Sequence, residues 1–511
     1  MRTKRQTWRS IFPVVVLLLF CFITRLFRLT LLPMFVDEGT HFERAIKMMQ
    51  EGPFFDSGGT GKFFVNWIIG LMVALTGNNL LWAGRFVSVG FGMLGLIGCY
   101  LLGQRLFNRR VGLVGAGLYL AVPYTFFYDR IALADGPMMI LVIYLVLVSL
   151  EFARRPNVRF SLGIGVLLMF IIMTKLNGFV YGVLPLLVMA IYLPRSKWTQ
   201  VWKELLLVYS IGALGFIPSL LHFSMHWDLI WRKVSVSQSG ENSLGWNWLP
   251  NANNMFDYLT TNLSWPVFII VCLGVAWALI RRQRAGLLLI VCAGITLALF
   301  VFTPKPWAWF PRYLLPAVPP LFLLAGQVIN LGLDWLRSVL TEARWRNVVI
   351  PGLALIVVGP ALWFDYWLLA DPTQAPFCEL DQSQFITGAS AGYGLLEVSA
   401  YLRDQVSSAE HIVIVYARRP SALSLVVEAY LHDQREHILS QVVDFATADP
   451  TLLSQRLQAQ TAPVFIIAAD PPKIPGAMID LDTSPFIQRV AHFDRPGKLT
   501  GISVYQKVQH P

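Results

Sequence analysis

Residues 25–42 read RLFRLTLLPMFVDEGTHF, a stretch in which an apolar segment ends in two adjacent acids, Asp37 and Glu38. The apolar segment begins at Ile11 and continues to Leu32. A carboxylate is costly close to hydrocarbon, and acids that occur there usually serve a function. The stretch therefore raises two questions: whether the segment spans a membrane, and what chemistry the acids at its end perform.

The composition of the chain favours a membrane protein. Of the 511 residues, 55% are hydrophobic and 14% are charged, whereas a soluble domain has about 25% charged residues. The formal net charge is +11, but Lys and Arg lie in short loops between apolar runs and form no basic stripe with interleaved aromatics, which argues against nucleic acid as a partner. The five cysteines lack the spaced pairs of a disulfide framework or a zinc site.

Eleven apolar segments are long enough to cross a bilayer, since a membrane helix needs about 20 residues and fewer within a packed bundle. They are residues 11–32, 80–106, 111–127, 133–153, 160–174, 177–193, 203–224, 265–281, 286–303, 312–333 and 347–369. The first segment has no small-residue cleavage site, which argues against a signal peptide. We therefore expect a mostly α polytopic membrane domain over residues 1–370, with long external loops at 33–79 and 225–264.

Lys and Arg are unequally distributed between the two sets of loops. The set that includes the N-terminus carries 19 of them, against 10 in the opposite set. By the positive-inside rule we expect the N-terminus in the cytoplasm. Eleven spans across the plasma membrane then place the C-terminus outside, and they place the acids of the opening stretch at the outer face.

Further charged residues gather on this expected outer face. Asp129, Arg130 and Asp135 follow the third segment, Lys175 lies in a hairpin, and Lys305 and Arg312 precede the tenth segment. Asp135 leads directly into an apolar span, where acids are rare and mark functional sites. The outer face therefore combines acids with cations at the ends of several spans.

This combination suits one kind of reaction. An acid can act as a general base or as a metal ligand, and cations near the end of a span can bind an anionic lipid headgroup. We infer a reaction at the outer leaflet between a phosphate-linked lipid and a hydroxyl acceptor, in which cations stabilise the departing phosphate. No motif requires a cofactor; if a divalent metal takes part, Asp37, His41 and Asp135 are its candidate ligands.

Several of these residues also have a structural interpretation. Asp37 and Glu38 suit the N-cap of a helix in the loop. Arg25 and Arg28 can extend along the lipid to reach the headgroups, and Lys62 can act as an anchor at the interface.

The composition changes after about residue 370. The segments HIVIVYA (411–417) and PVFIIAA (463–469) are typical of buried strands, and GLLEVSAYLRDQV (394–406) and SALSLVVEAYLHD (421–433) of amphipathic helices. Alternating helices and strands predict a small α/β domain over residues 371–511, outside the membrane.

The opening stretch resembles the first-span signature of family 39 glycosyltransferases, an R-L-x-R-L segment followed by an Asp-Glu pair. This family includes protein O-mannosyltransferases and the transferase that adds aminoarabinose to lipid A. Further similar segments follow in order over about residues 11–335: GKFFVNWIIGL (61–71), GRFVSVGFGMLGLIGCYLLGQRLF (84–107), RIALADGPMM (130–139), MTKLNGFVYGVLPLL (173–187) and PRYLLPAVPPL (311–321). Their order and spacing carry the resemblance.

The resemblance implies a membrane enzyme of the type C fold. It would transfer a sugar, with inversion, from a polyprenyl-phosphate-linked donor to a hydroxyl acceptor on a protein, a lipid or a glycan. Asp37 would be the general base and Glu38 would support it. The donor would be held by Asp135 and by the basic residues Lys62, Arg85 and Arg312, to which the charges of the outer face add Arg130, Lys175 and Lys305.

Two departures from the family pattern leave the sugar and the acceptor open. The Asp-Glu pair is followed by GTHF rather than by Ala and aromatics, and Lys62 is followed by two Phe rather than by a Pro-Pro pair. Three other functions are alternatives: the transfer of a phospho-group from a lipid, the transport or flipping of a lipid-linked sugar, and a structural membrane anchor for residues 371–511, which would not need the acids. Against transport, the acids cluster on one face and no inverted repeat is evident.

Overall fold

The computed structural model describes residues 2–54, 61–77, 79–225, 248–302, 310–416, 422–442, 460–469, 481, 486–497 and 501–508. The chain forms two compact units. The first, here called the helical unit, comprises Met1–Leu29, Arg44–Gly70 and Arg85–Cys378; the second, the sheet unit, comprises Thr30–Glu43, Leu71–Gly84 and Glu379–Pro511. The inclusion of residues 30–43 and 71–84 in the second unit was not apparent from the sequence.

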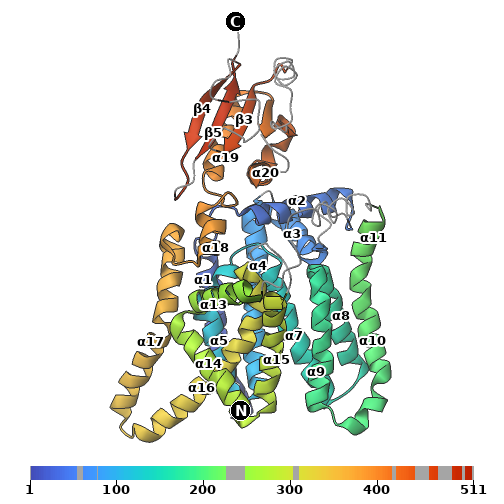
Figure 1. Cartoon of the computed structure of the whole chain (residues 1–511), viewed down its shortest axis with the longest axis vertical. Helices are drawn as coiled ribbons and strands as arrows, with labels where there is room; N and C mark the ends of the chain where they lie inside the picture. Colours follow the sequence, from blue (N-terminus) through green and yellow to red (C-terminus); the bar gives the residue numbers. More distant parts are fainter. Residues whose placement is uncertain are drawn as a thin grey trace. The chain divides into compact units, whose positions relative to one another are not determined.

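Helices of 6 to 28 residues form most of the helical unit (Figure 1). They are α1 (Arg2–Leu26), α4 (Leu80–Leu106), α5 (Arg109–Ala121), α6 (Pro123–Tyr128), α7 (Asp135–Arg154), α8 (Val158–Thr174), α9 (Val183–Tyr192), α10 (Trp202–Ala213), α11 (Ile217–Met225), α13 (Trp248–Leu263), α14 (Trp265–Arg281), α15 (Arg284–Phe302), α16 (Val318–Val339) and α17 (Ala343–Ala370). The expected mostly α membrane architecture is therefore confirmed. The expected segment 80–106 coincides with α4, whose start and end match the apolar run.

Fewer spans pass a test of length and composition than the eleven expected. Among the described residues, six helical stretches are long and apolar enough to cross a membrane, or seven if α13 and α14, which meet at a bend of 114°, count as one span. The expected segment 111–127 is divided into α5 and α6, because Pro123 begins a new helix after the extended residue Val122. Shorter apolar helices account for residues 11–26, 158–174 and 176–192.

The expected outer loops contain helices as well. Within residues 33–79 the chain forms α2 (Val36–Glu51) and α3 (Phe63–Thr76), and α3 is itself apolar. In the second loop α13 covers residues 248–263, and residues 226–247 lie outside the described part of the chain. The loop at 33–79 is therefore largely helical, which its short apolar run of 14 residues did not indicate.

Glycines on α4 allow close packing inside the helical unit. A Cβ atom at Gly92 would lie 2.5 Å from Cγ of Asp129, and one at Gly95 would lie 2.2 Å from the hydroxyl oxygen of Tyr119. Both distances are too short for real atoms, so any larger residue at either position would displace Asp129 or Tyr119. The space left by these two glycines holds the polar side chains described below.

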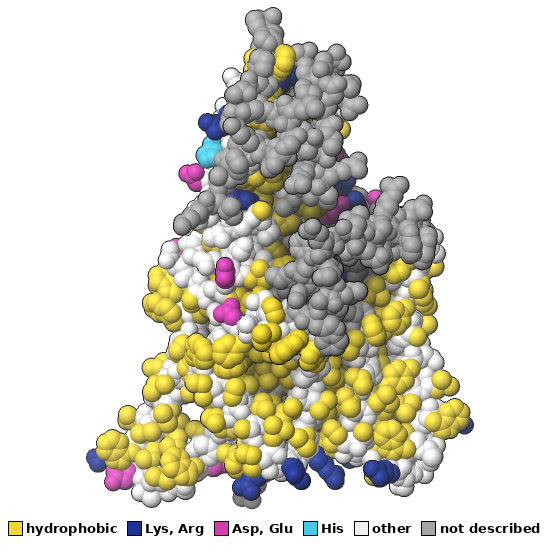
Figure 2. Space-filling view, viewed as in Figure 1, with side chains coloured by type: hydrophobic (Ala, Val, Ile, Leu, Met, Phe, Trp, Pro, Cys, Tyr) yellow, Lys and Arg dark blue, Asp and Glu magenta, His cyan; other side chains and the backbone are white. Residues whose placement is uncertain are grey.

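Hydrophobic side chains cover the visible surface of the helical unit, and Lys and Arg side chains gather along its lower edge (Figure 2). Such a distribution is typical of a membrane protein whose basic loops lie on one side of the bilayer.

The sheet unit contains a five-stranded sheet of strand order β2-β1-β3-β5-β4. Its strands are β1 (Ile412–Tyr416), β2 (Ile438–Val442), β3 (Val464–Ala469), β4 (Ile487–Phe493) and β5 (Ile502–Lys507), accompanied by α19 (Leu395–Ser408) and α20 (Ala422–Tyr430). β1 runs parallel to β2 and β3, whereas β5 runs antiparallel to β3 and β4. The two apolar segments expected as strands are β1 and β3, and both are buried.

Candidate functional site

The helical unit places three of the expected site residues together. Asp135 begins α7, Lys175 follows the last residue of α8, and Arg312 lies in a short 3-10 helix (Pro311–Ala317) before α16. The Asp135 carboxylate forms ion pairs with both cations: Oδ1 with Nζ of Lys175, and Oδ2 with Nε of Arg312 at 3.7 Å. The three side chains are 8%, 14% and 4% exposed, so this acid–cation cluster is largely shielded from solvent.

Aromatic rings hold both cations of the acid–cation cluster. Nζ of Lys175 lies 4.3 Å from the centre of the Tyr313 ring, and Cζ of Arg312 lies 4.1 Å from the centre of the Phe310 ring. Cation–π contacts stabilise a positive charge without cancelling it. The cluster carries one negative and two positive charges, a balance that suits an anionic headgroup.

A cavity of about 180 Å³ borders this cluster. Asp135, Lys175 and Tyr313 contribute to its lining, together with Tyr181 and Thr296, whose hydroxyl oxygens are 3.0 Å apart. The two hydroxyl residues were not predicted, because each lies within an apolar segment with no charge beside it. Only the position of Tyr313 next to Arg312 could have indicated a role from the sequence.

Lys62 lies on a segment that packs beside Lys175. The preceding residue, Gly61, has a φ of +67°, and a Cβ atom there would lie 2.9 Å from Cγ of Leu176. Because Leu176 follows Lys175 directly, the two expected cations lie on adjoining segments of the helical unit. The position of Lys62 is therefore compatible with its expected role in donor binding, which remains a prediction.

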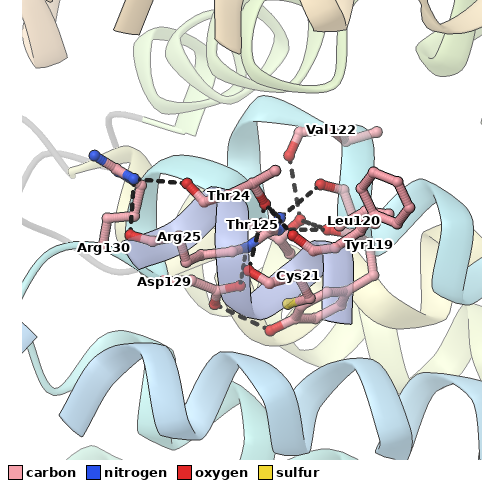
Figure 3. Close-up of polar contacts among 10 residues, drawn as sticks. Cys21, Thr24, Arg25, Tyr119, Leu120, Val122, Thr125, Asp129 and Arg130 are labelled. Atoms are coloured by element: carbon pink, nitrogen blue, oxygen red, sulfur yellow. Dashed lines mark hydrogen bonds and ion pairs between the residues drawn. The ribbon is translucent and has the colours of Figure 1, made fainter. Parts of the chain in front are cut away.

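A second group of polar residues in the helical unit is fully buried (Figure 3). Nε of Arg25 pairs with Oδ2 of Asp129 at 3.4 Å, and the Tyr119 hydroxyl donates to Oδ1 of Asp129 at 3.0 Å. The Arg25 guanidinium also donates to the carbonyl oxygens of Tyr119 and Leu120 at 3.1 and 2.9 Å. The interpretation of Arg25 as a residue that extends to the headgroups was therefore wrong, because its charge is neutralised inside the protein.

Two of the expected donor-binding arginines contact the C-terminal end of α1. Arg130 donates to four carbonyl oxygens of residues 24–28 at 2.8–3.0 Å. Arg85, which is fully buried, donates to the carbonyl oxygen of Leu29 at 2.9 Å. The last carbonyl groups of a helix have no partner within the helix, and Arg130 supplies one to those of Thr24 and Arg25; Leu29, the acceptor of Arg85, follows the end of α1. The contacts thus give Arg85 and Arg130 a structural role, and their expected role in donor binding remains a prediction.

Asp37 and Glu38 lie in the first turn of α2, in the sheet unit, and the structure separates their roles. Glu38 is fully buried, and its Oε2 accepts a hydrogen bond of 3.0 Å from the backbone N–H of Phe35. This is the reaching-back contact of a capping box, so the capping interpretation applies to Glu38. Asp37 is partly exposed and lies in the first turn of α2, at the end of the helix where the dipole is positive.

The remaining expected residues add little. His41 is buried within α2. The described residues contain no group of three or more His, Cys, Asp or Glu side chains arranged to hold a metal ion. Lys305 lies outside the described part of the chain.

Sequence comparisons relate the chain to sugar transferases. Residues 61–222 match a family model described as dolichyl-phosphate-mannose-protein mannosyltransferase. A curated relative, undecaprenyl phosphate-alpha-4-amino-4-deoxy-L-arabinose arabinosyl transferase 2 of Pseudomonas fluorescens, is 28% identical over 313 residues, which cover 57% of this chain and 52% of the relative. The matched region thus spans about half the length of that relative.

Structural comparisons extend over nearly the whole chain. ArnT from Cupriavidus metallidurans bound to undecaprenyl phosphate superposes with a TM-score of 0.62 and 16% identity, covering 98% of both chains. The oligosaccharyltransferase of Archaeoglobus fulgidus in its apo form superposes with a TM-score of 0.57 and 12% identity, over 90% of this chain and 70% of that one. The resemblance that the sequence motifs indicated is therefore confirmed: the chain has the fold of the type C membrane glycosyltransferases.

Proposed function

We propose that the protein transfers a sugar from a polyprenyl-phosphate-linked donor to a hydroxyl acceptor at the outer face of the plasma membrane. The observation that carries this proposal is the acid–cation cluster of Asp135, Lys175 and Arg312 beside its cavity. The names of similar proteins support the donor class, since one is an undecaprenyl phosphate-linked arabinosyl transferase and another was solved with undecaprenyl phosphate bound.

In this mechanism Lys175 and Arg312 bind the phosphate of the donor. As the bond between the sugar carbon and the phosphate oxygen breaks, negative charge develops on that oxygen, and two positioned cations stabilise it. Asp135 keeps both cations in place, because one carboxylate bridges them. Lys62 follows Gly61 on the adjoining segment and adds a third positive charge.

Asp37 is the proposed general base. It accepts the proton of the acceptor hydroxyl while the acceptor oxygen bonds to the sugar carbon, on the side opposite the leaving phosphate, so the configuration inverts. Glu38 supports this role by fixing the first turn of α2 through its bond to Phe35. The base and its support thus come from one helical turn.

The orientation is part of the proposal. The N-terminus lies in the cytoplasm and the sheet unit lies outside, because the loops on the side of the N-terminus hold 19 Lys and Arg against 10 on the other. The basic edge of the helical unit supports this arrangement (Figure 2). Neither a nucleic acid nor a cytoplasmic nucleotide takes part, and membrane lipids surround the helical unit.

An assay with purified protein in nanodiscs tests the donor site. The donors are undecaprenyl-phosphate-linked 4-amino-4-deoxy-L-arabinose and mannose, the acceptors are extracted envelope lipids, and the readouts are released undecaprenyl phosphate and the mass of the product. We expect Arg312→Gln to raise KM for the donor about tenfold to a hundredfold, the effect of one lost charged hydrogen bond. Arg312→Lys, which keeps the charge, should restore part of that loss.

The matched control for the donor site is Arg110→Gln, because Arg110 forms an exposed ion pair with Asp334 at 2.8 Å and should not affect KM. If Arg312→Gln and Arg110→Gln have the same KM for the donor and the same thermal stability, Arg312 does not bind the donor. In sealed proteoliposomes, a lipid-linked sugar that crosses the bilayer without forming a new glycosidic bond would favour the transport alternative.

A second substitution tests the general base. Asp37→Asn keeps the size of the side chain but removes its basicity, so turnover at saturating donor and acceptor should fall about a hundredfold to ten-thousandfold. Glu38→Gln should have a smaller effect, because an amide oxygen can still accept the hydrogen bond from Phe35. Near-normal turnover of Asp37→Asn would exclude it as the base.

A further inference from the structure

The sheet unit contains a pocket of its own, of about 530 Å³. All of the described residues that line it belong to this unit, among them Met34, Leu80, Leu81, Arg403, Tyr430 and Asp433. A volume of this size is within the range of about 300–1,000 Å³ that holds small molecules. The pocket is separate from the cavity beside Asp135, which lies in the helical unit.

One wall of this pocket is polar and fixed. Arg403 of α19 makes a two-fold contact with the carboxylate of Asp433: Nη1 pairs with Oδ2, and Nη2 donates to Oδ1 at 2.9 Å. Nη2 of Arg403 also donates to the carbonyl oxygen of Tyr430 at 2.7 Å, and the Tyr430 hydroxyl accepts from the backbone N–H of Met34 at 2.8 Å. The wall therefore presents a guanidinium and a carboxylate whose charges cancel.

Another part of the lining is apolar and belongs to the first turn of α4. Leu80 and Leu81 are buried and are the first two residues of α4, which is one of the candidate membrane spans. Asn79 begins this helix, since its Oδ1 accepts from the N–H of Trp82 at 3.1 Å. Because α4 is long and apolar enough to cross a membrane, we expect its first residues at about the depth of the lipid headgroups.

We propose that this pocket binds the head of a neutral, hydroxyl-rich amphiphile, such as a glycolipid. A sugar hydroxyl can donate to the Asp433 carboxylate and accept from the Arg403 guanidinium, so a neutral ion pair suits it well. An anionic head gains little there, because Asp433 repels it as strongly as Arg403 attracts it. The apolar part of the amphiphile packs against Leu80 and Leu81.

A polypeptide is a poorer match for this pocket. Extended peptides usually add to an exposed edge of a sheet, and the edge strands here are β2 and β4. The described residues that line the pocket belong to neither strand. The inference that this amphiphile is the acceptor of the sugar rests on the proposed function. The inference that the pocket binds it does not.

Saturation-transfer difference NMR on the full-length protein in amphipol tests the binding. The probe is octyl β-glucoside below its critical micelle concentration, compared with octyl phosphate. We expect saturation of the sugar protons of the glucoside and at least tenfold weaker binding of the phosphate. Stronger binding of octyl phosphate, or no saturation of the sugar protons, would overturn the proposal.

Three variants locate the signal. Asp433→Asn should weaken glucoside binding about tenfold, because a neutral amide replaces a charged acceptor. Ala429→Phe, at another lining position, should abolish binding by filling the pocket while the ion pair remains. The control is Asp334→Asn, the same change in the exposed pair with Arg110, which should bind normally. Equal binding by all variants at unchanged melting temperature would place the glucoside elsewhere and overturn the proposal.

Competition identifies the source of the amphiphile. Displacement of the glucoside by an extracted glycolipid supports an acceptor site, whereas displacement by an undecaprenyl-phosphate-linked sugar supports a site for the donor sugar. Displacement by a Ser- and Thr-containing peptide would overturn the proposal in favour of a protein ligand. If the protein transfers no sugar while Asp433→Asn still weakens glucoside binding, the proposed binding of the amphiphile is supported and the proposed function is wrong.

Discussion

Removing Asp129 should destabilise the protein far more than removing Asp334, although the ion pair of Asp334 is the shorter. The pair between Arg110 and Asp334 measures 2.8 Å, but its side chains are 62% and 49% exposed. The pair between Arg25 and Asp129 measures 3.4 Å, with side chains 0% and 1% exposed. Distance alone ranks the exposed pair as stronger, whereas burial ranks it as weaker.

The expected cost of Asp129→Ala follows from what the substitution leaves behind. Removing one partner of a buried pair costs about 3–5 kcal/mol, because the other charge stays buried. Arg25 keeps two carbonyl acceptors, which places its share at the low end. The buried Tyr119 hydroxyl loses its acceptor, which adds about 1 kcal/mol or more. We expect a total of about 4 kcal/mol, against about 0–1 kcal/mol for Asp334→Ala.

Equilibrium unfolding with SDS in mixed micelles, followed by circular dichroism, measures both free energies. A double variant, Arg25→Met with Asp129→Leu, separates the ion pair from packing. Replacement of both partners by apolar groups is often nearly neutral, so the double variant should recover most of the loss. The burial argument is refuted if Asp129→Ala costs no more than Asp334→Ala, or if the double variant is less stable than Asp129→Ala.

Three further predictions concern packing, pH and topology. Gly92→Ala should lower thermal stability by displacing Asp129, since its Cβ would lie 2.5 Å from Cγ of that residue; an unchanged melting temperature would contradict this. The hydrogen bond from Arg403 lowers the pKa of Asp433, so its contribution to stability is full above the usual Asp pKa of about 4 and is lost below it. The difference in melting temperature between the wild type and Asp433→Asn should shrink as the pH falls below about 4. A difference that stays constant would refute the stabilising role of the charged Asp433. A reporter fused after residue 370 should be active outside the cytoplasm and one fused within residues 281–286 inside, and cytoplasmic activity of the first would overturn the orientation.

Local sequence patterns predict the parts of this fold that depend on neighbouring residues. The bounds of helix α4 were predicted to the residue from the apolar segment 80–106. The break at Pro123 was missed because residues 111–127 are apolar throughout, and α3 was missed because its 14 residues are short for a span. The composition of a segment gives its length and its hydrophobicity. A helix break inside an apolar segment, or a helix too short to span a membrane, changes these two quantities little.

The candidate site also contains residues that the sequence predicted and residues that it did not. Asp135, Lys175 and Arg312 were found because charges at the ends of apolar segments are conspicuous, and the structure brings them together. Tyr181 and Thr296 carry no charge and were missed. The burial of Arg25 was missed for another reason: its partner is 104 residues away, and no local pattern reports such a pairing.

The pairing of Arg25 with Asp129 has a consequence for synthesis. Arg25 leaves the ribosome 104 residues before Asp129, and translation at about 5–20 residues per second makes this an interval of about 5–20 seconds. During that time the first helix carries a cation whose final counter-ion does not yet exist. Until Asp129 is synthesised, the charge of Arg25 therefore needs other partners, such as water or lipid headgroups.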